Sequence, residues 1–243
     1  TRLDQADQFT RNLSSLRATV QTADSVLSQV VLALTRAIAL GTQGANGTLS
    51  DPQRQALAQE VRNIHTQLLE LSNTAVNGVY LFAGTAVTAP PYAADPNAPS
   101  GVQYNGNANA LRVEIASGET IQTQLPGSQI FSSPGADAFQ ALHDLAVALH
   151  SGGDAAAATA SLKAALDHIG VQRIAYGSAL SRLEQAEQAL GRETVSLHQQ
   201  ESDLVAADLA RAATDYSRAQ TALQAALQAG GQLSRWSLLD FLR

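Results

Sequence analysis

Acidic side chains are the first residues of this sequence whose types and spacing could do chemistry. Glu201, Asp203 and Asp208 lie close together in one segment, and two carboxylates that face each other across a cleft can act as general acid and base. These three lie on one predicted helix, without a second wall that would bring another catalytic group toward them. We therefore interpret them as a solvated helix face or as a surface for salt bridges between subunits.

The histidines do not have the spacing of a metal site. Helical zinc motifs place two histidines four residues apart, and that spacing does not occur among His65, His143, His150, His168 and His198. The sequence also lacks the phosphate-binding loops, dinucleotide fingerprints and nucleophile elbows of common enzyme families. We therefore predict no catalytic, metal or cofactor site, and a protein that is not an enzyme.

Composition narrows the class of protein further. The chain has 243 residues, of which 45% are hydrophobic, so it can bury a real core. The formal net charge is −6 and the basic residues are scattered, which argues against nucleic acid as a partner. Cysteine is absent, which excludes disulfides and thiol chemistry. No run of 18 apolar residues is present, so membrane insertion is not predicted.

Residues 1–77 are predicted to form the first part of a helical rod, as an antiparallel pair of helices. Apolar residues recur at alternating steps of four and three, the seam of helices in a coiled-coil-like bundle. The expected seam is Leu13, Leu16, Val20, Leu27 and Leu34 in the first helix and Val61, Ile64 and Leu68 in the second. Glycines from Gly41 onward predict the connecting loop, Asp51 the cap of the second helix, and Asn77-Gly78 its end.

Residues 78–135 have a different composition, and the helical period disappears there. Six of the seven prolines fall in this segment, and proline and glycine are typical of turns. Alternating apolar residues on both sides of Ser117-Gly118 predict a β-hairpin. We therefore expect a small β-rich insertion.

Residues 136–209 are predicted to form the second part of the rod, with one helix continuing from about residue 154 to 229. Its expected core seam repeats every seven residues at Leu183, Leu190, Leu197 and Leu204. Residues 210–243 are predicted to be a C-terminal assembly helix, because the stripe of Leu209, Tyr216 and Leu223 outruns the partner helices within the sequence. We expect that stripe to be covered by another molecule.

The stretch NGVYLFAGTAVTAPPY, residues 77–92, resembles the segment that closes the second helix in flagellin-like proteins, above all in hook-associated proteins. VQYNGNANALRVEIASGETIQTQLPGSQIF, residues 102–131, is similar to the β segment of the same family, and the ending SLLDFL is similar to that of hook-associated members. The resemblance covers essentially the whole sequence. It implies a fold that is mainly α with a small β-rich insertion, an elongated helical rod or coiled-coil bundle of flagellin-like type.

The resemblance also implies how the parts work. We expect an anchor in which the chain leaves the helix as a strand and pins the β insertion to the rod, formed by Gly78, Tyr80, Leu81, Phe82 and Gly84. Family members begin with a further N-terminal helix that pairs with the C-terminal one. The resemblance therefore implies that the partner of residues 210–243 is missing from this sequence.

The implied function is a structural adaptor at the hook-filament junction of the bacterial flagellum. Implied partners are the hook-side junction protein, flagellin, neighbouring copies in a ring, and a cytoplasmic export chaperone at the C-terminal helix. The expected assembly and chaperone-binding residues are Leu209, Tyr216, Leu223, Leu227, Leu238, Leu239 and Phe241. The implied location is extracellular, after type III export without a cleaved signal peptide.

Three other functions remain open at this stage. Flagellin itself is the nearest one and would polymerise indefinitely. A cell-wall hydrolase on a helical stalk would need convergent carboxylates in a cleft, and a scaffold unrelated to flagella would form stable coiled-coil dimers.

Overall fold

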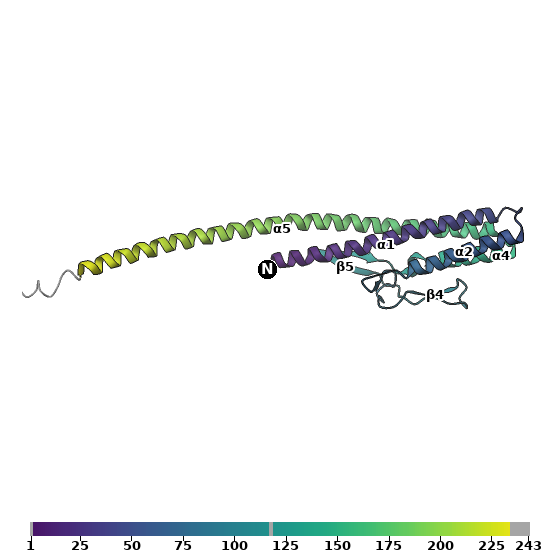
Figure 1. Ribbon diagram of the computed structural model, residues 1–243, viewed down its shortest axis with the longest axis horizontal. Coiled ribbons are helices and arrows are strands. Elements are labelled where there is room, and N and C mark those ends of the chain that lie inside the picture. The colour runs from purple at the N-terminus through teal and green to yellow at the C-terminus, as the bar shows by residue number, and fades with distance from the viewer. Residues whose placement is uncertain (1, 117–118, 234–243) are drawn as a thin grey trace, which may run out of the picture. The chain divides into compact units, whose positions relative to one another are not determined.

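The computed structural model describes residues 2–116 and 119–233 (Figure 1). Its helices are α1 (Arg2–Gly44), α2 (Asp51–Ser72), α3 (Gly127–Ile130), α4 (Ala138–Ser151) and α5 (Ala155–Leu233). Its strands are β1 (Ala75–Val76), β2 (Val79–Tyr80), β3 (Tyr92–Ala94), β4 (Val102–Tyr104), β5 (Leu111–Ala116), β6 (Glu119–Gln124), β7 (Ser132–Ser133) and β8 (Ala136–Asp137). The predicted fold class, mainly α with a small β-rich insertion, is confirmed.

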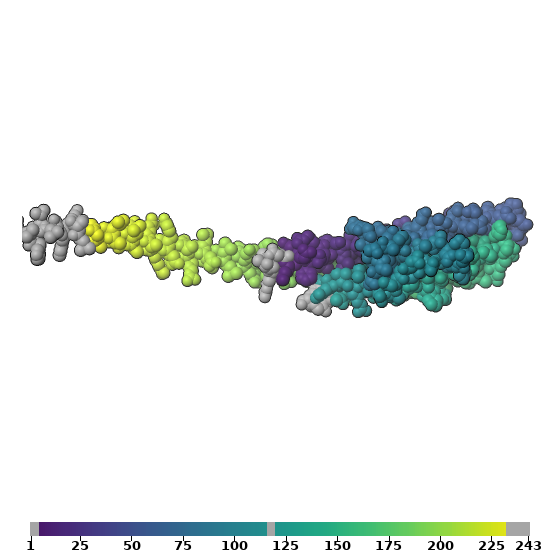
Figure 2. Space-filling view, turned by 90° about the horizontal axis from the view of Figure 1, so that it is seen from below, coloured from purple at the N-terminus to yellow at the C-terminus, as the bar shows by residue number. Residues whose placement is uncertain are grey.

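The chain divides into two compact units. One comprises Asp7–Ala189, and the other comprises Thr1–Ala6 with Leu190–Arg243. The first unit contains α2 to α4, all the strands, most of α1 and the first part of α5. The rest of α5 belongs to the second unit, and Figure 2 colours its atoms from green to yellow.

The first unit is a bundle of α1, α2, α4 and the first part of α5, with an apolar core. Leu27, Leu68, Leu142 and Leu162, one from each helix, are fully buried. Ion pairs tie α1 to α5 in antiparallel register. The Arg173 guanidinium contacts the Asp24 carboxylate at 3.0 Å, and Arg17 reaches Glu184 at 3.1 Å.

Helix α1 continues through the glycines that we predicted to begin a loop. Gly41 and Gly44 both lie within α1, which ends at Gly44. A methyl group on Gly41 would collide with the Thr159 hydroxyl, and one on Gly44 would collide with Leu149. The glycines therefore permit close packing of α1 against α4 and α5, and the prediction that they form a loop was wrong.

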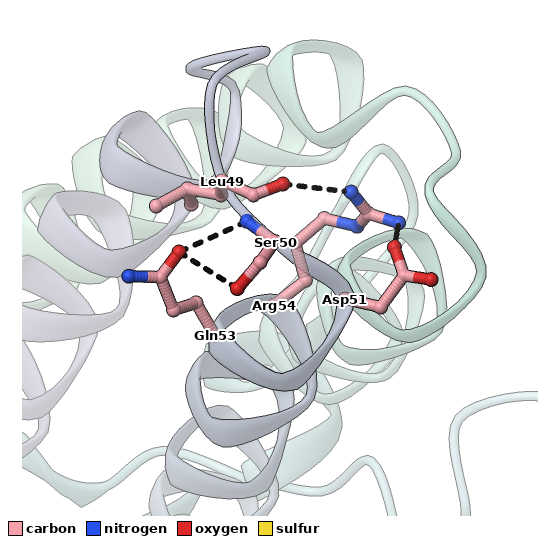
Figure 3. A network of polar contacts seen from close by, with 5 residues as sticks. All are labelled: Leu49, Ser50, Asp51, Gln53 and Arg54. Carbon is pink, nitrogen blue, oxygen red and sulfur yellow. Dashed lines mark hydrogen bonds and ion pairs between the residues drawn. The ribbon is translucent and has the colours of Figure 1, made fainter.

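Helix α2 begins one residue earlier than predicted, with Ser50 and not Asp51 at the N-cap. The Gln53 side-chain oxygen accepts hydrogen bonds from the Ser50 backbone N–H and hydroxyl, each at 2.9 Å (Figure 3). Arg54 crosses the same turn, where it contacts the Asp51 carboxylate and donates to the Leu49 carbonyl at 3.1 Å. Asp51 is thus the ion-pair partner of Arg54 in the first turn of α2. Its negative charge also interacts favourably with the positive end of the helix dipole.

The end of α2 also differs from the prediction. The helix stops at Ser72, and Asn77-Gly78 forms the turn of the β1–β2 hairpin, in which Ala75 pairs with Tyr80. Both turn residues have positive φ, 53° for Asn77 and 79° for Gly78. Two successive residues of this kind suit the tight primed turns that match the twist of paired strands. The Asn-Gly pair therefore closes a hairpin and does not end a helix.

The strands pair as four two-stranded antiparallel sheets. In the β5–β6 hairpin Val113 lies opposite Ile121, which confirms the predicted hairpin. The Asp137 carboxylate caps α4 by accepting from the Gln140 N–H at 2.9 Å. The predicted long helix is confirmed as well, because α5 runs from Ala155 to Leu233 without a break.

One helix, over Gln5–Gly44, is long and apolar enough to cross a membrane by length and composition. The same helix supplies core residues of the bundle, including Leu13, Val20, Leu27 and Leu34, each at most 2% exposed. Core helices of soluble proteins pass the same test. The bundle core accounts for the apolar composition of α1. The absence of membrane insertion by α1 remains a prediction.

Candidate assembly surfaces and aromatic anchor

The predicted anchor residues enter the bundle directly after the β1–β2 hairpin. Gly78 lies in the hairpin turn and Tyr80 at the end of β2, where Tyr80 is half-buried. Leu81 and Phe82 are fully buried, but they follow β2 and are not part of it. The strand therefore ends before Leu81 and is shorter than predicted. The backbone turns again at Gly84, which has a φ of 69°.

Phe82 belongs to a cluster of rings that joins the insertion to α4. Phe82 stands edge-on to Phe131, with ring centroids 5.1 Å apart. Tyr92 lies 4.9 Å from Tyr104 and 4.9 Å from Phe139, which is the second residue of α4. Edge-to-face and tilted ring pairs of this kind add stability beyond the buried area alone. Tyr80 is not one of these ring partners, so Phe82 is the predicted anchor aromatic that the structure places in the cluster.

Polar groups fix the cluster to the end of α2. The Asn73 side chain accepts from the Tyr92 N–H at 2.9 Å and donates to the Tyr92 carbonyl at 2.8 Å. The Tyr92 hydroxyl lies 3.0 Å from the Ser132 hydroxyl, and burial raises the pKa of this Tyr well above its usual range. The Asn73 side chain thus hydrogen-bonds to the β3 backbone as a neighbouring strand would. Asn73 is the residue directly after the end of α2.

Two further contacts close the cluster around the Phe82 carbonyl. This oxygen accepts from the Gly127 N–H at 2.7 Å, and the Tyr104 hydroxyl donates to it at 3.0 Å. A methyl group on Gly127 would lie only 2.7 Å from the Tyr92 ring. Sequence reasoning missed Asn73, Tyr104, Gly127, Phe131 and Phe139 as anchor residues, because they are scattered over 67 positions that only the fold brings together.

Most of the predicted seam residues lie in the core. Leu13, Val20, Leu27, Leu34, Val61, Ile64, Leu68 and Leu183 are at most 5% exposed. Leu16, Leu190 and Leu197 are half-buried. Leu204 is 69% exposed, so its place in the core of this chain was predicted wrongly. The seven-residue repeat that links it to Leu183 continues along α5 among described residues that are exposed.

Exposed apolar side chains follow one another along α5 beyond the bundle. Leu209, Tyr216, Leu223 and Leu227, the predicted assembly residues that the structure describes, are 60 to 70% exposed. Val195 and Val205 are exposed to the same degree. Leu238, Leu239 and Phe241, the remaining predicted assembly residues, lie outside the described residues. A helix face with this much exposed apolar surface is typical of an interaction site.

The acidic residues considered for catalysis lie on exposed helix surface. Glu201 is 3.8 Å from the His198 ring, and Asp203 accepts from the Gln199 side chain at 3.0 Å. Within residues 2–116 and 119–233, no group of three or more His, Asp or Glu side chains is arranged to hold a metal ion. Glu201, Asp203 and Asp208 are exposed and are thus placed for contacts with solvent or with another molecule.

The chain matches two known sequence families at its two ends. Residues 1–87 match the bacterial flagellin N-terminal helical region, and residues 159–242 match the bacterial flagellin C-terminal helical region. These are the segments that contain α1, α2, β1, β2 and most of α5. Phe82 lies in the first match, and the other rings of the anchor lie between the two matches, at Tyr92, Tyr104, Phe131 and Phe139.

Curated relatives match over most of the chain. The sequence is 29% identical to flagellar hook-associated protein 3 of Escherichia coli, over 97% of this chain and 81% of that protein. It is 30% identical to flagellar hook-associated protein 3 of Salmonella typhimurium, over 92% of this chain and 77% of that protein. Among solved structures, a putative flagellar hook-associated protein from Vibrio parahaemolyticus superimposes with a TM-score of 0.76 at 17% identity, covering 83% of this chain and 92% of that one.

Proposed function

Because this chain belongs to the family of flagellar hook-associated protein 3, we infer that it is a structural adaptor of the hook-filament junction. The observation that carries this conclusion is the match to hook-associated protein 3 over more than three quarters of each relative, with flagellin-type helical regions at both ends. The adaptor works by matching interfaces and not by catalysis. Its place is in the flagellum.

The partners are other components of the hook and filament. The adaptor contacts the hook-side junction protein on one side, flagellin on the other, and neighbouring copies of itself in a ring. The exposed stripe of Leu209, Tyr216, Leu223 and Leu227 supports this proposal, because apolar side chains that are 60 to 70% exposed need a partner. An N-terminal helix of the flagellin type is the partner that we propose for this stripe.

Before assembly, the same C-terminal segment binds a small export chaperone in the cytoplasm, and the protein then leaves the cell through the flagellar export channel. The exposed stripe and the absence of cysteine are compatible with threading an unfolded chain. Truncation after Leu209 is expected to abolish chaperone binding in a pull-down while the bundle stays folded by circular dichroism. A truncated chain that still binds the chaperone would refute this part of the proposal.

Reconstitution on isolated hooks tests the adaptor function. Full-length protein is added to hooks that carry the hook-side junction protein, flagellin monomer is supplied, and filaments are counted by electron microscopy. Filament growth that depends on this protein, without long polymers from the protein alone, supports the adaptor. Long polymers from the protein alone would identify a flagellin, and failure to bind hooks would refute the proposed function.

A further inference from the structure

Asn-Gly pairs are the sites at which a protein most readily loses a side-chain amide without an enzyme. The backbone nitrogen of the glycine attacks the asparagine side chain, and glycine permits this approach because it has no side chain of its own. Asparagine is accordingly one of the thermolabile residues. The sequence has three such pairs, Asn46-Gly47, Asn77-Gly78 and Asn105-Gly106. The fold places them in three different settings.

The pair Asn105-Gly106 is held on both sides by backbone hydrogen bonds. The Asn105 N–H donates to the Pro91 carbonyl at 2.7 Å, and the Asn107 N–H donates to the Ala83 carbonyl at 3.2 Å. A methyl group on Gly106 would lie 2.9 Å from the same Ala83 oxygen, so the backbone is also closely packed. An attack by the Gly106 nitrogen requires these contacts to open, and the fold therefore protects Asn105.

The pair Asn77-Gly78 is protected by the β1–β2 hairpin. These two residues form its turn, directly between the paired residues Val76 and Val79. Both have positive φ, 53° and 79°, the conformation that a primed turn requires. A rotation that brings the Asn77 side chain onto the glycine nitrogen takes the turn out of this conformation and breaks the strand pairing.

The pair Asn46-Gly47 lies in the loop between α1 and α2, and both residues are exposed. The φ of Gly47 is outside the left-handed region, and a methyl group there would meet no atom within 4 Å. Within residues 2–116 and 119–233, the Gly47 N–H has no hydrogen-bond partner. The described fold therefore neither requires a glycine at this position nor occupies its nitrogen.

Thr48 supplies a group that can assist the attack on Asn46. Its hydroxyl donates to the Asn46 side-chain oxygen at 3.1 Å. Negative charge develops on this oxygen when a nitrogen adds to the amide carbon, and a donor already in place stabilises that charge. The backbone bond that closes the turn is long, because the Leu49 N–H reaches the Asn46 carbonyl at 3.4 Å.

We propose that Asn46 is the residue at which the folded protein deamidates, with the Thr48 hydroxyl assisting. The Gly47 nitrogen loses its proton to hydroxide and bonds to the side-chain carbon of Asn46. The bond between that carbon and the amide nitrogen breaks, and this nitrogen takes a proton from water and leaves as ammonia. Water then opens the resulting succinimide ring at either carbonyl, which leaves aspartate or isoaspartate at position 46.

The product adds a negative charge at one end of the bundle. Asn46 lines a surface pocket of about 260 Å³ together with Arg54 and Asp154. Arg54 already contacts the Asp51 carboxylate, so a new carboxylate in this pocket is placed to compete for the same guanidinium. The reaction is independent of the proposed function, because no partner takes part in it.

Peptide mapping by mass spectrometry tests the assignment. The full chain is incubated in mildly alkaline buffer and digested, and the conversion of amide to carboxylate is measured at each asparagine. In the folded protein, Asn46 is expected to react at least about tenfold faster than Asn77 and Asn105, the factor that corresponds to about one protecting hydrogen bond. In concentrated urea the three rates should become similar. Asn77 or Asn105 reacting as fast as Asn46 in the folded protein would overturn the proposal, and so would an Asn46 that reacts only in urea.

Two positions next to Asn46 test the mechanism. Gly47→Ala should remove most of the reaction, because its methyl group hinders the nitrogen and meets no atom of the described fold. Thr48→Val should slow the reaction, and Thr48→Ser, which restores the hydroxyl, should recover the wild-type rate. A Gly47→Ala protein that reacts at the wild-type rate would show that this nitrogen is not the attacking group. Equal rates for the valine and serine variants would exclude the hydroxyl, and circular dichroism checks that each variant is folded.

Discussion

Helix α5 has the same kind of apolar repeat along its length, but the two parts of the helix use it differently. In the Asp7–Ala189 unit, Leu162, Ile169 and Leu183 are fully buried. In the other unit, Leu209, Leu223 and Leu227 are 60 to 70% exposed. The pattern is therefore the same where it stabilises the monomer and where it is available to a partner. Apolar periodicity identifies a face that will be buried, and it does not say by which molecule.

The largest effect is expected in the aromatic anchor of the first unit. Phe82→Ala removes a fully buried ring that packs edge-on against Phe131, and it should reduce the free energy of unfolding by about 3–5 kcal/mol. Thermal unfolding followed by circular dichroism measures this change. Tyr216→Ala, at a position 70% exposed, is the control and should leave the melting temperature almost unchanged. A Phe82→Ala protein that kept its melting temperature and strand content would remove the basis for the anchor.

A matched pair of leucines on α5 tests the comparison most directly. Leu162→Ala removes a fully buried side chain and should cost about 2–5 kcal/mol of stability. Leu227→Ala, where the side chain is 67% exposed, should change stability by less than about 0.5 kcal/mol. Urea unfolding of both variants gives the two values. Similar losses at the two positions would mean that the second part of the helix is covered within the monomer.

Glycine substitutions sharpen the contrast between a packed site and an open helix. Gly127→Ala brings a methyl group within 2.7 Å of the Tyr92 ring and should destabilise the protein by about 1–3 kcal/mol. Gly177→Ala, where a methyl group would meet no atom within 4 Å, should stabilise α5 by about 0.5–1 kcal/mol. Opposite signs in denaturant unfolding are the expected result. A stabilising Gly127→Ala would show that the cluster can shift to make room.

The smallest effect is a pH dependence from His65. Burial lowers the pKa of His65 below its usual value of 6.5, so the unfolded chain binds a proton more readily than the folded one. The contribution of His65 to the free energy of unfolding is therefore fully present above pH 6.5. It is lost as the pH falls from 6.5 toward the pKa of His65 in the folded protein. The unfolding free energy of the wild type should decrease from about pH 7.5 to about pH 5.5, and His65→Gln should flatten this slope. A His65→Gln protein that kept the wild-type slope would contradict this assignment.

The insertion shows which parts of a fold can be predicted from sequence. The β5–β6 hairpin follows from local alternation around residues 117–118, because the two strands are neighbours in the chain. The anchor does not follow in this way. Phe131 meets Phe82, and Tyr92 meets Phe131 and Phe139, only after the insertion folds back onto α4. Such contacts leave no local period.

Glycine and asparagine gave errors for a similar reason. Gly41 and Gly44 predict a loop if only local propensity counts, but their lack of a side chain lets α1 approach Thr159 and Leu149. Asn77-Gly78 is compatible with a helix end and with a primed turn, and the pairing of Ala75 with Tyr80 selects the turn. Both choices depend on neighbours that are distant in sequence or on strand pairing.

By itself, the sequence determined the helical class, the long α5, the place of the insertion, the β5–β6 hairpin and the apolar faces, because each of these depends on periodicity over neighbouring residues. Only the tertiary structure decided which of those faces are buried in the monomer, where α2 begins and ends, and which rings form the anchor. Those features depend on contacts between segments far apart in the chain. Their energies come from packing and desolvation, and a one-dimensional pattern does not encode them.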